Sequence, residues 1–159
     1  MKTLILYSTK YGCTKSLAES LANHIGEAKL CNLKTDKSPS LAEFDCIIIG
    51  SPLYVGMVRK EVKTYAEEHI DELKLKRIGL YLSGLNEENS GECFNLNFPK
   101  EIMNIAHAKA FLGGVFDRSK ASLFEKLIMK AVMKSSDSCS MILENHIVSF
   151  ADEMKQPEI

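Results

Sequence analysis

Short apolar runs alternate with amphipathic stretches along this chain. The runs at residues 4–7, 46–49 and 77–83 lack the regular polar positions of a half-exposed strand, so we expect strands that are buried on both faces. The predicted strands cover residues 4–7, 29–33, 45–50, 77–83 and 110–116. The predicted helices cover residues 16–25, 60–70, 94–107, 123–134 and 141–154. This alternation predicts an α/β fold, a three-layer sandwich in which a five-stranded parallel sheet carries helices on both faces.

The first predicted strand runs into a turn that is rich in hydroxyl groups. The turn consists of Ser8, Thr9, Lys10, Tyr11, Gly12, Cys13 and Thr14. A strand, such a turn and a helix N-terminus make an anion pocket, because free backbone N–H groups and the positive end of the helix dipole point at it. The pocket suits the phosphate of a mononucleotide, bound through hydroxyls and amides. The alternative is an ordinary helix start with Thr14 as its N-cap.

Other phosphate-binding patterns are absent from this turn. Its one glycine does not make the Gly-x-Gly-x-x-Gly fingerprint of dinucleotide sites, and Gly-x-x-x-x-Gly-Lys-Ser/Thr is missing too. A Cys-x5-Arg loop starting at Cys13 would need arginine where Glu19 stands. A phosphorylated receiver would need a carboxylate where Ser8 stands. These exclusions leave the mononucleotide phosphate as the favoured ligand.

Two further loops leave predicted strands at the same edge of the sheet, where open parallel sheets bind their ligands. The loop at residues 51–57 offers Tyr54 between two glycines, either to stack on a planar ring or to pack as a lid residue. The loop at residues 83–93 offers Gly84, which lets a ligand approach the backbone, and Asn86, which can pair with a heterocycle. Ordinary turn chemistry is the alternative for both residues.

Composition narrows the class of protein. We predict a single domain over residues 1–159, because no linker, repeat or low-complexity stretch divides the chain. A net charge of −1 gives no basis for a nucleic-acid partner. The five cysteines are odd in number and form no Cys-x-x-Cys pair, which predicts reduced thiols in a cytoplasmic protein and no metal site. No apolar run approaches the length of a membrane span, and no signal-peptide cleavage site follows the N-terminus.

The turn at residues 8–14, together with residues 50–56, resembles the flavodoxin-like FMN-binding proteins over essentially the whole chain. Residues 1–9 and 125–130 are most similar to the branch that contains the flavodoxin-fold, quinone-linked protoporphyrinogen dehydrogenases. The resemblance implies a non-covalent FMN whose phosphate lies on the first loop and whose isoalloxazine lies between the other two. The residues that it implies for those two loops are Pro52, Leu53, Tyr54, Val55, Gly56, Ser83, Gly84, Leu85 and Asn86.

The resemblance also implies a redox function, and two classes of it stay open. One is electron transfer with a redox partner protein or a small-molecule donor or acceptor. The other is an enzyme that oxidises protoporphyrinogen. This chain departs from the family at Tyr11, where a hydroxyl residue usually stands next to the glycine, and in its near-neutral charge, since many flavodoxin carriers are strongly acidic. Glu87 and Glu88 are expected to lower the flavin potential by opposing the anionic reduced form.

The predicted helix at residues 123–134 has one apolar side and several lysines on the other. It is either a surface helix with solvated lysines or a docking face for an acidic partner, for anionic lipid or for a porphyrin's propionates. A peripheral membrane contact is one of these alternatives. The lysines concerned are Lys126, Lys130 and Lys134.

Overall fold

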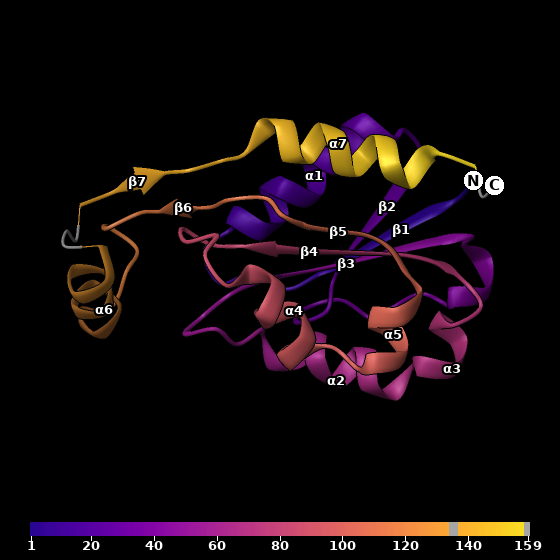
Figure 1. Cartoon of the computed structure of the whole chain (residues 1–159), viewed down its shortest axis with the longest axis horizontal. Coiled ribbons are helices and arrows are strands. Elements are labelled where there is room, and N and C mark those ends of the chain that lie inside the picture. Colours follow the sequence, from indigo (N-terminus) through magenta and orange to yellow (C-terminus); the bar gives the residue numbers. More distant parts are fainter. Residues whose placement is uncertain (134–136, 158–159) are drawn as a thin grey trace.

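The structure is a computed structural model that describes residues 1–133 and 137–157. Five strands form one parallel sheet in the order β2-β1-β3-β4-β5 (Figure 1). The strands are β1 (Thr3–Tyr7), β2 (Ala28–Asn32), β3 (Cys46–Pro52), β4 (Arg77–Ser83) and β5 (Ala106–Phe111). The predicted five-stranded parallel sheet is therefore confirmed.

Helices cover both faces of this sheet. They are α1 (Cys13–Ile25), α2 (Lys60–Glu68), α3 (Ile70–Leu73), α4 (Ser90–Asn97), α5 (Lys100–Ile105), α6 (Leu123–Met133) and α7 (Glu144–Lys155), with a short 3-10 turn at Leu41–Glu43. Figure 1 shows α1 and α7 on one face and α2 to α5 on the other. Leu21 of α1 and Phe150 of α7 share a buried cluster with Ile48 of β3. This arrangement confirms the predicted three-layer sandwich.

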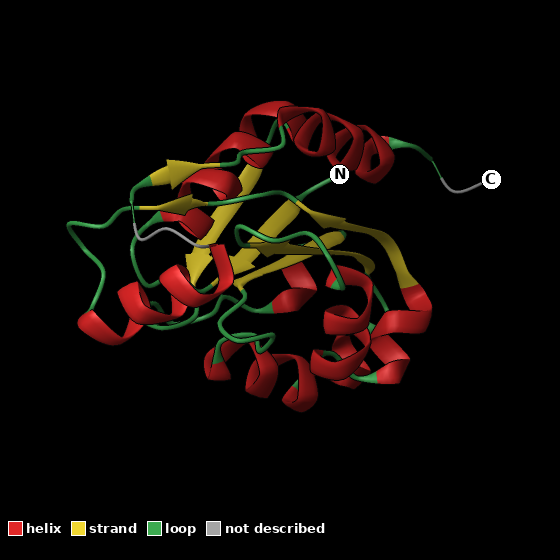
Figure 2. Cartoon of the chain, turned by 60° about the vertical axis from the view of Figure 1, so that its left-hand side comes forward, coloured by secondary structure: helices red, strands yellow, loops and turns green. Residues whose placement is uncertain are grey.

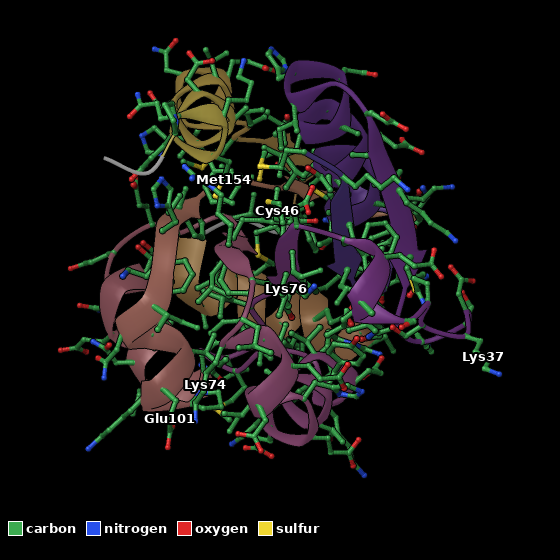
Figure 3. The ribbon with its side chains drawn as sticks, turned by 90° about the vertical axis from the view of Figure 1, so that its right-hand side faces the viewer. Lys37, Cys46, Lys74, Lys76, Glu101 and Met154 are labelled. Atoms are coloured by element: carbon green, nitrogen blue, oxygen red, sulfur yellow. The ribbon has the colours of Figure 1, made fainter. Side chains whose placement is uncertain are left out.

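The two faces are closed by separate apolar clusters. Val62 of α2 and Ile102 of α5 belong to the second cluster, on the face opposite α7. Figure 3, seen from the end at which the strands begin, shows Met154 of α7 on one side of the sheet and Glu101 of α5 on the other. Because both faces of the central strands are covered, these strands need apolar residues at every position, which explains the uninterrupted run at Cys46–Ile49.

The last strand differs from its prediction because two glycines end it. β5 lies earlier than the predicted strand at residues 110–116 and begins where a helix was predicted. Gly113 has a φ of +79°, which breaks the extended backbone after β5. The following residues form β6 (Val115–Phe116) instead, which pairs antiparallel with β7 (Cys139–Ser140).

Several helix boundaries also differ from their predictions. Residues 90–93 are the first turn of α4, not part of a loop. Pro99 separates α4 from α5, because its ring cannot continue a helix. The helix predicted at residues 60–70 breaks at His69, whose Nδ1 lies 3.0 Å from the Tyr65 carbonyl oxygen. α7 begins at Glu144, three residues after the predicted start.

Residues 112–133 leave the sheet after β5 and residues 137–143 lead back to it at α7; we call these two described stretches together the α6 arm. β6 and β7 run side by side toward α6, at the end of the sheet where the parallel strands finish (Figures 1 and 2). In Figure 2, α6 is the helix furthest to the left. Within residues 1–133 and 137–157, every helix is too short or too polar to span a bilayer.

α6 is confirmed as a helix, and three of its apolar side chains are exposed to solvent. They are Leu123, Phe124 and Leu127, of which 81%, 63% and 66% is exposed. Lys126 is half-buried and Lys130 is exposed, whereas Lys134 lies outside the described residues.

Candidate functional site

The first loop, residues 8–14, joins β1 to α1 and presents a row of backbone N–H groups. The Gly12 N–H donates to Thr9 Oγ1 over 2.9 Å, and the φ of +95° at Gly12 turns the chain into α1. Within the described part of the chain, the N–H groups of residues 9–11 and 13–15 have no acceptor. They lie at the N-terminus of a 13-residue helix, whose dipole favours an anion there.

Thr14 is not the N-cap of α1, so the capped-helix alternative is wrong. The helix starts at Cys13 and its N-cap is Gly12, which makes no side-chain cap. Because Thr14 is already inside the helix, its hydroxyl turns to the end of β4 and lies 2.9 Å from Ser83 Oγ. Both side chains are buried, and the Tyr81 hydroxyl donates to the Thr14 carbonyl over 3.1 Å. Thr14 therefore connects the first loop to the third.

A carboxylate holds the first hydroxyl of the loop. The buried Ser8 hydroxyl donates to Glu61 Oε1 over 3.0 Å, and Arg59 Nη2 donates to the same oxygen over 3.3 Å. Burial raises the pKa of Glu61, but its own N–H, the Ser8 hydroxyl and the Arg59 charge together lower the pKa below its usual value. Glu61 is therefore ionised at neutral pH, and it accepts the hydrogen bond that the Ser8 hydroxyl donates.

The second loop is a tight hairpin turn, shorter than predicted because β3 continues through Pro52. The N–H of Tyr54 donates to the Met57 carbonyl over 2.9 Å, and the reverse bond measures 3.0 Å. Val55 and Gly56 have φ values of +50° and +73°, as the central residues of a two-residue hairpin require. The turn leaves the Tyr54 side chain 42% exposed.

The Lys10 side chain joins the first and second loops. Its Nζ lies 5.1 Å from the centroid of the Tyr11 ring and 5.8 Å from that of the Tyr54 ring. Both distances are typical of a cation over an aromatic face. Two exposed aromatic rings and one ammonium group are therefore gathered beside the free N–H groups.

The third loop starts at Ser83 and is built by turn chemistry. Asn86 Oδ1 accepts the Glu88 N–H over 2.9 Å, which is the alternative that the sequence left open for this residue. The Gly84 N–H donates to the Gly113 carbonyl over 3.0 Å. A Cβ at Gly84 would lie 3.3 Å from the Phe111 ring, so the glycine serves this close packing. Leu85 lies between these two turns and is half-buried.

Glu125 contacts the first loop although it lies 115 residues from Lys10 in the sequence, and this contact was not predicted from the sequence. Its carboxylate accepts hydrogen bonds from Lys10 Nζ and from the Tyr11 hydroxyl, the latter over 2.5 Å. Glu125 and Ser122 also form a reciprocal capping box with two bonds of 3.1 Å. The Ser-x-x-Glu pattern predicts the start of α6, but not the partner that α6 meets.

Burial and hydrogen bonds decide the protonation states of Glu125 and Cys13. Burial raises the pKa of Glu125, but the hydrogen bonds from Lys10, Tyr11 and the Ser122 N–H outweigh it and lower the pKa below its usual value. Burial raises the pKa of the Cys13 thiol, and a hydrogen bond from the Val115 backbone opposes this only partly. Glu125 is therefore a carboxylate at neutral pH, while Cys13 stays a neutral thiol that offers its backbone N–H.

The structure thus brings the three predicted loops together at one edge of the sheet. The hydroxyls of Ser8 and Thr14 are already paired inside the protein, whereas the Thr9 hydroxyl only accepts a hydrogen bond, from the Gly12 N–H. Backbone N–H groups and the Thr9 hydroxyl are therefore the donors that the loop offers to an anion. The exposed ring of Tyr54 offers a planar apolar surface next to them. This donor set fits a phosphate ester that carries a flat aromatic ring system.

Comparison with known proteins agrees with this geometry. A family model described as a flavodoxin domain matches residues 4–141. The quinone-linked protoporphyrinogen IX dehydrogenase of Escherichia coli (strain K12) is 25% identical over 146 residues, which cover 86% of this chain and 81% of that protein.

Solved structures share the fold at low sequence identity. A flavodoxin of Streptococcus pneumoniae TIGR4 superposes with a TM-score of 0.62 at 16% identity, covering 97% of both chains. The oxidised flavodoxin 1 of Bacillus cereus superposes with a TM-score of 0.55 at 13% identity, again covering 97% of both chains. At this identity the likeness concerns the fold alone.

Proposed function

This chain belongs to the flavodoxin family of FMN-binding redox flavoproteins, and from this premise we propose how its own residues hold the flavin. The observation that carries the proposal is the row of acceptor-free N–H groups at residues 9–11 and 13–15, beside the exposed Tyr54 ring. These N–H groups bind the FMN phosphate, with Gly12 providing the turn. Lys10 adds a positive charge on the same loop.

The second and third loops hold the isoalloxazine. Tyr54 covers one ring face, and the turn at Val55 and Gly56 fixes its position. The backbone from Ser83 to Asn86 lies along the pyrimidine edge, where N–H and carbonyl groups match the donors and acceptors of that edge. Pro52 and Leu53 lie beside the start of the third loop and border the isoalloxazine there, because the Leu53 N–H donates to the Ser83 carbonyl over 2.8 Å.

The flavin supplies the redox chemistry when it is bound, and the chain sets its position and potential. Glu87 and Glu88 place negative charge near the third loop, which disfavours an anionic reduced flavin. The Glu87 carboxylate lies 3.8 Å from His146 Nδ1. We place electron transfer to a redox partner protein or a small molecule first among the functions of the bound flavin.

Oxidation of protoporphyrinogen is the second candidate function. The similarity to the Escherichia coli dehydrogenase favours it, and so does the α6 arm, which places exposed apolar side chains and lysines beside the first loop. An anionic tetrapyrrole would find both apolar and basic surface there. The near-neutral charge of the chain also gives no long-range steering toward a basic carrier partner.

One assay separates the two functions. FMN-loaded protein is mixed with protoporphyrinogen and a quinone, and porphyrin fluorescence is followed against free FMN at the same concentration. Porphyrin formation well above the free-flavin rate supports the enzyme. A rate equal to that of free FMN, with rapid electron exchange between the bound flavin and a redox protein, supports the carrier.

Charge reversal on α6 tests whether its lysines serve either function. Lys126→Glu with Lys130→Glu should leave FMN affinity intact, because neither residue lies in the three loops. The variant should lower porphyrinogen turnover, or transfer to an acidic partner, severalfold at low salt, and the loss should shrink above about 0.5 M salt. Binding to anionic lipid vesicles is measured alongside, to test the membrane alternative.

The matched control carries the same charge change at the opposite end of the sheet. Lys29→Glu with Lys74→Glu reverses two charges away from the loops: Lys29 pairs with Leu4 near the start of β1, and Lys74 follows α3. The control should behave like the wild type in every assay. If the α6 variant and the control give the same rates at low salt, the lysines of α6 form an ordinary solvated surface.

A further inference from the structure

The α6 arm connects two of the three loops that form the flavin site. At its root, the Gly113 carbonyl accepts the Gly84 N–H over 3.0 Å, and the Met141 N–H donates to the Gly114 carbonyl over 2.8 Å. At its tip, Glu125 contacts Lys10 and Tyr11. The arm therefore starts at the third loop and closes on the first.

The contact at the tip is an ion pair whose two side chains differ in solvent exposure. Only 7% of the Glu125 side chain is exposed, against 44% of the Lys10 side chain. A carboxylate so deeply buried depends on its counter-charge, because an unpaired buried charge is costly. Lys10 supplies this charge, and the Tyr11 hydroxyl and the Ser122 N–H supply the remaining hydrogen bonds.

Lys10 also belongs to the proposed flavin site, through both its backbone N–H and its ammonium group. Its own N–H belongs to the row of acceptor-free donors, so a phosphate bound there lies on the same loop as the ammonium group. Its Nζ lies 5.8 Å from the centroid of the Tyr54 ring, the ring on which the proposed isoalloxazine stacks. An incoming FMN therefore competes for the Lys10 charge with its phosphate, at a loop where Lys10 also lies beside the stacking residue.

We propose that Glu125 is a latch that holds the α6 arm closed on the first loop in the flavin-free protein, and that FMN releases it by competing for Lys10. This inference rests on the proposed FMN site. The phosphate and the Glu125 carboxylate carry charge of the same sign and share one cation, so each weakens the binding of the other. Linkage makes the effect reciprocal: the factor by which the closed arm weakens phosphate binding equals the factor by which bound phosphate weakens closure of the arm.

Glu125→Gln tests the latch, because glutamine keeps the size of the side chain and removes its charge. In flavin-free protein, the variant should accelerate hydrogen exchange of the α6 amides, while exchange in β1 and β3 stays unchanged. It should also tighten FMN binding by about fivefold to tenfold, within the usual range of such couplings, and tighten riboflavin binding less. Glu144→Gln, on the first turn of α7, is the control with the same change in charge.

Lys10→Met separates the latch from a merely structural contact. This variant should free the arm as Glu125→Gln does, but it should weaken FMN binding because the cation is lost. In the wild type, FMN and inorganic phosphate should each accelerate α6 exchange, with FMN effective at lower concentration.

The outcomes for the latch and for the FMN site are distinct. Unchanged α6 exchange in flavin-free Glu125→Gln overturns the latch whether or not FMN binds. Slower α6 exchange in the wild type on adding FMN overturns the release, because the arm would then be closing on the ligand. A wild-type protein that binds neither FMN nor phosphate contradicts the proposed site and, with it, the coupling.

Discussion

At the scale of single residues, the side chains that the sequence singled out have two kinds of role. Ser8 and Thr14 were expected to offer hydroxyls to a phosphate, but both are buried and paired within the protein. Tyr54 and Lys10 are exposed and lie against each other. The hydroxyls therefore shape the loop, while backbone N–H groups and the two exposed side chains are left to meet the ligand.

Thr14→Ala should lower the free energy of unfolding by about 1–3 kcal/mol, because it leaves the buried Ser83 hydroxyl without its partner. Urea denaturation of the flavin-free protein measures this loss. Thr14→Ser keeps the hydroxyl and should recover most of the stability. Equal losses in the two variants would show that the Thr14 methyl group, not the hydrogen bond, is what stabilises the contact.

Tyr54→Ala should weaken FMN binding by about 1–3 kcal/mol, the usual contribution of an aromatic stack on a planar ring. Quenching of flavin fluorescence during titration gives the dissociation constant. Tyr54→Phe keeps the ring and should bind FMN as the wild type does. An unchanged dissociation constant for Tyr54→Ala would place the Tyr54 ring away from the flavin.

At the scale of elements, the sequence predicted most of the regular segments because their apolar pattern is local. β1 and β4 follow their predicted runs closely, and α1 starts three residues before its predicted start. β5 was misplaced because its apolar signal continues past Phe111 into β6; Gly113 and Gly114 weaken that pattern in the sequence, and in the structure they end the strand. The Glu125 contact was missed for a related reason, since it joins two elements that are distant in sequence.

Gly113→Ala should destabilise the root of the α6 arm. The residue has a φ of +79°, and a Cβ there would lie 1.8 Å from the Met141 carbonyl oxygen, so backbone must move. We expect a loss of about 1–3 kcal/mol in the free energy of unfolding, as for an overpacked site, together with faster hydrogen exchange in β6 and β7.

Gly91→Ala is the control for this prediction. Gly91 lies inside α4 and a Cβ there would meet nothing within 4 Å. Alanine should therefore raise the free energy of unfolding by about 0.5–1 kcal/mol through its helix propensity. If Gly113→Ala is as stable as the wild type, the arm is not held by close backbone packing at Gly113.

At the scale of the whole molecule, the sheet order places the ends of β1, β3 and β4 side by side. The fold class and the meeting of the three loops could be predicted from this topology, because parallel strands end at a common edge. The α6 arm could not, because its course depends on the glycine contact at its root and the ion pair at its tip. The arm adds exposed apolar surface to the edge where the flavin is proposed to bind.

The central claim is that this edge holds one FMN per chain through its phosphate and its ring. Titration of flavin-free protein with FMN, followed by flavin fluorescence, tests it most directly, with riboflavin and FAD titrated in parallel. We expect saturable quenching at one FMN per chain, weaker binding of riboflavin because it lacks the phosphate, and weaker binding of FAD because the loop accepts a terminal phosphate. The absence of saturable binding up to about 1 mM FMN, or equal affinity for FMN and riboflavin, would contradict the claim.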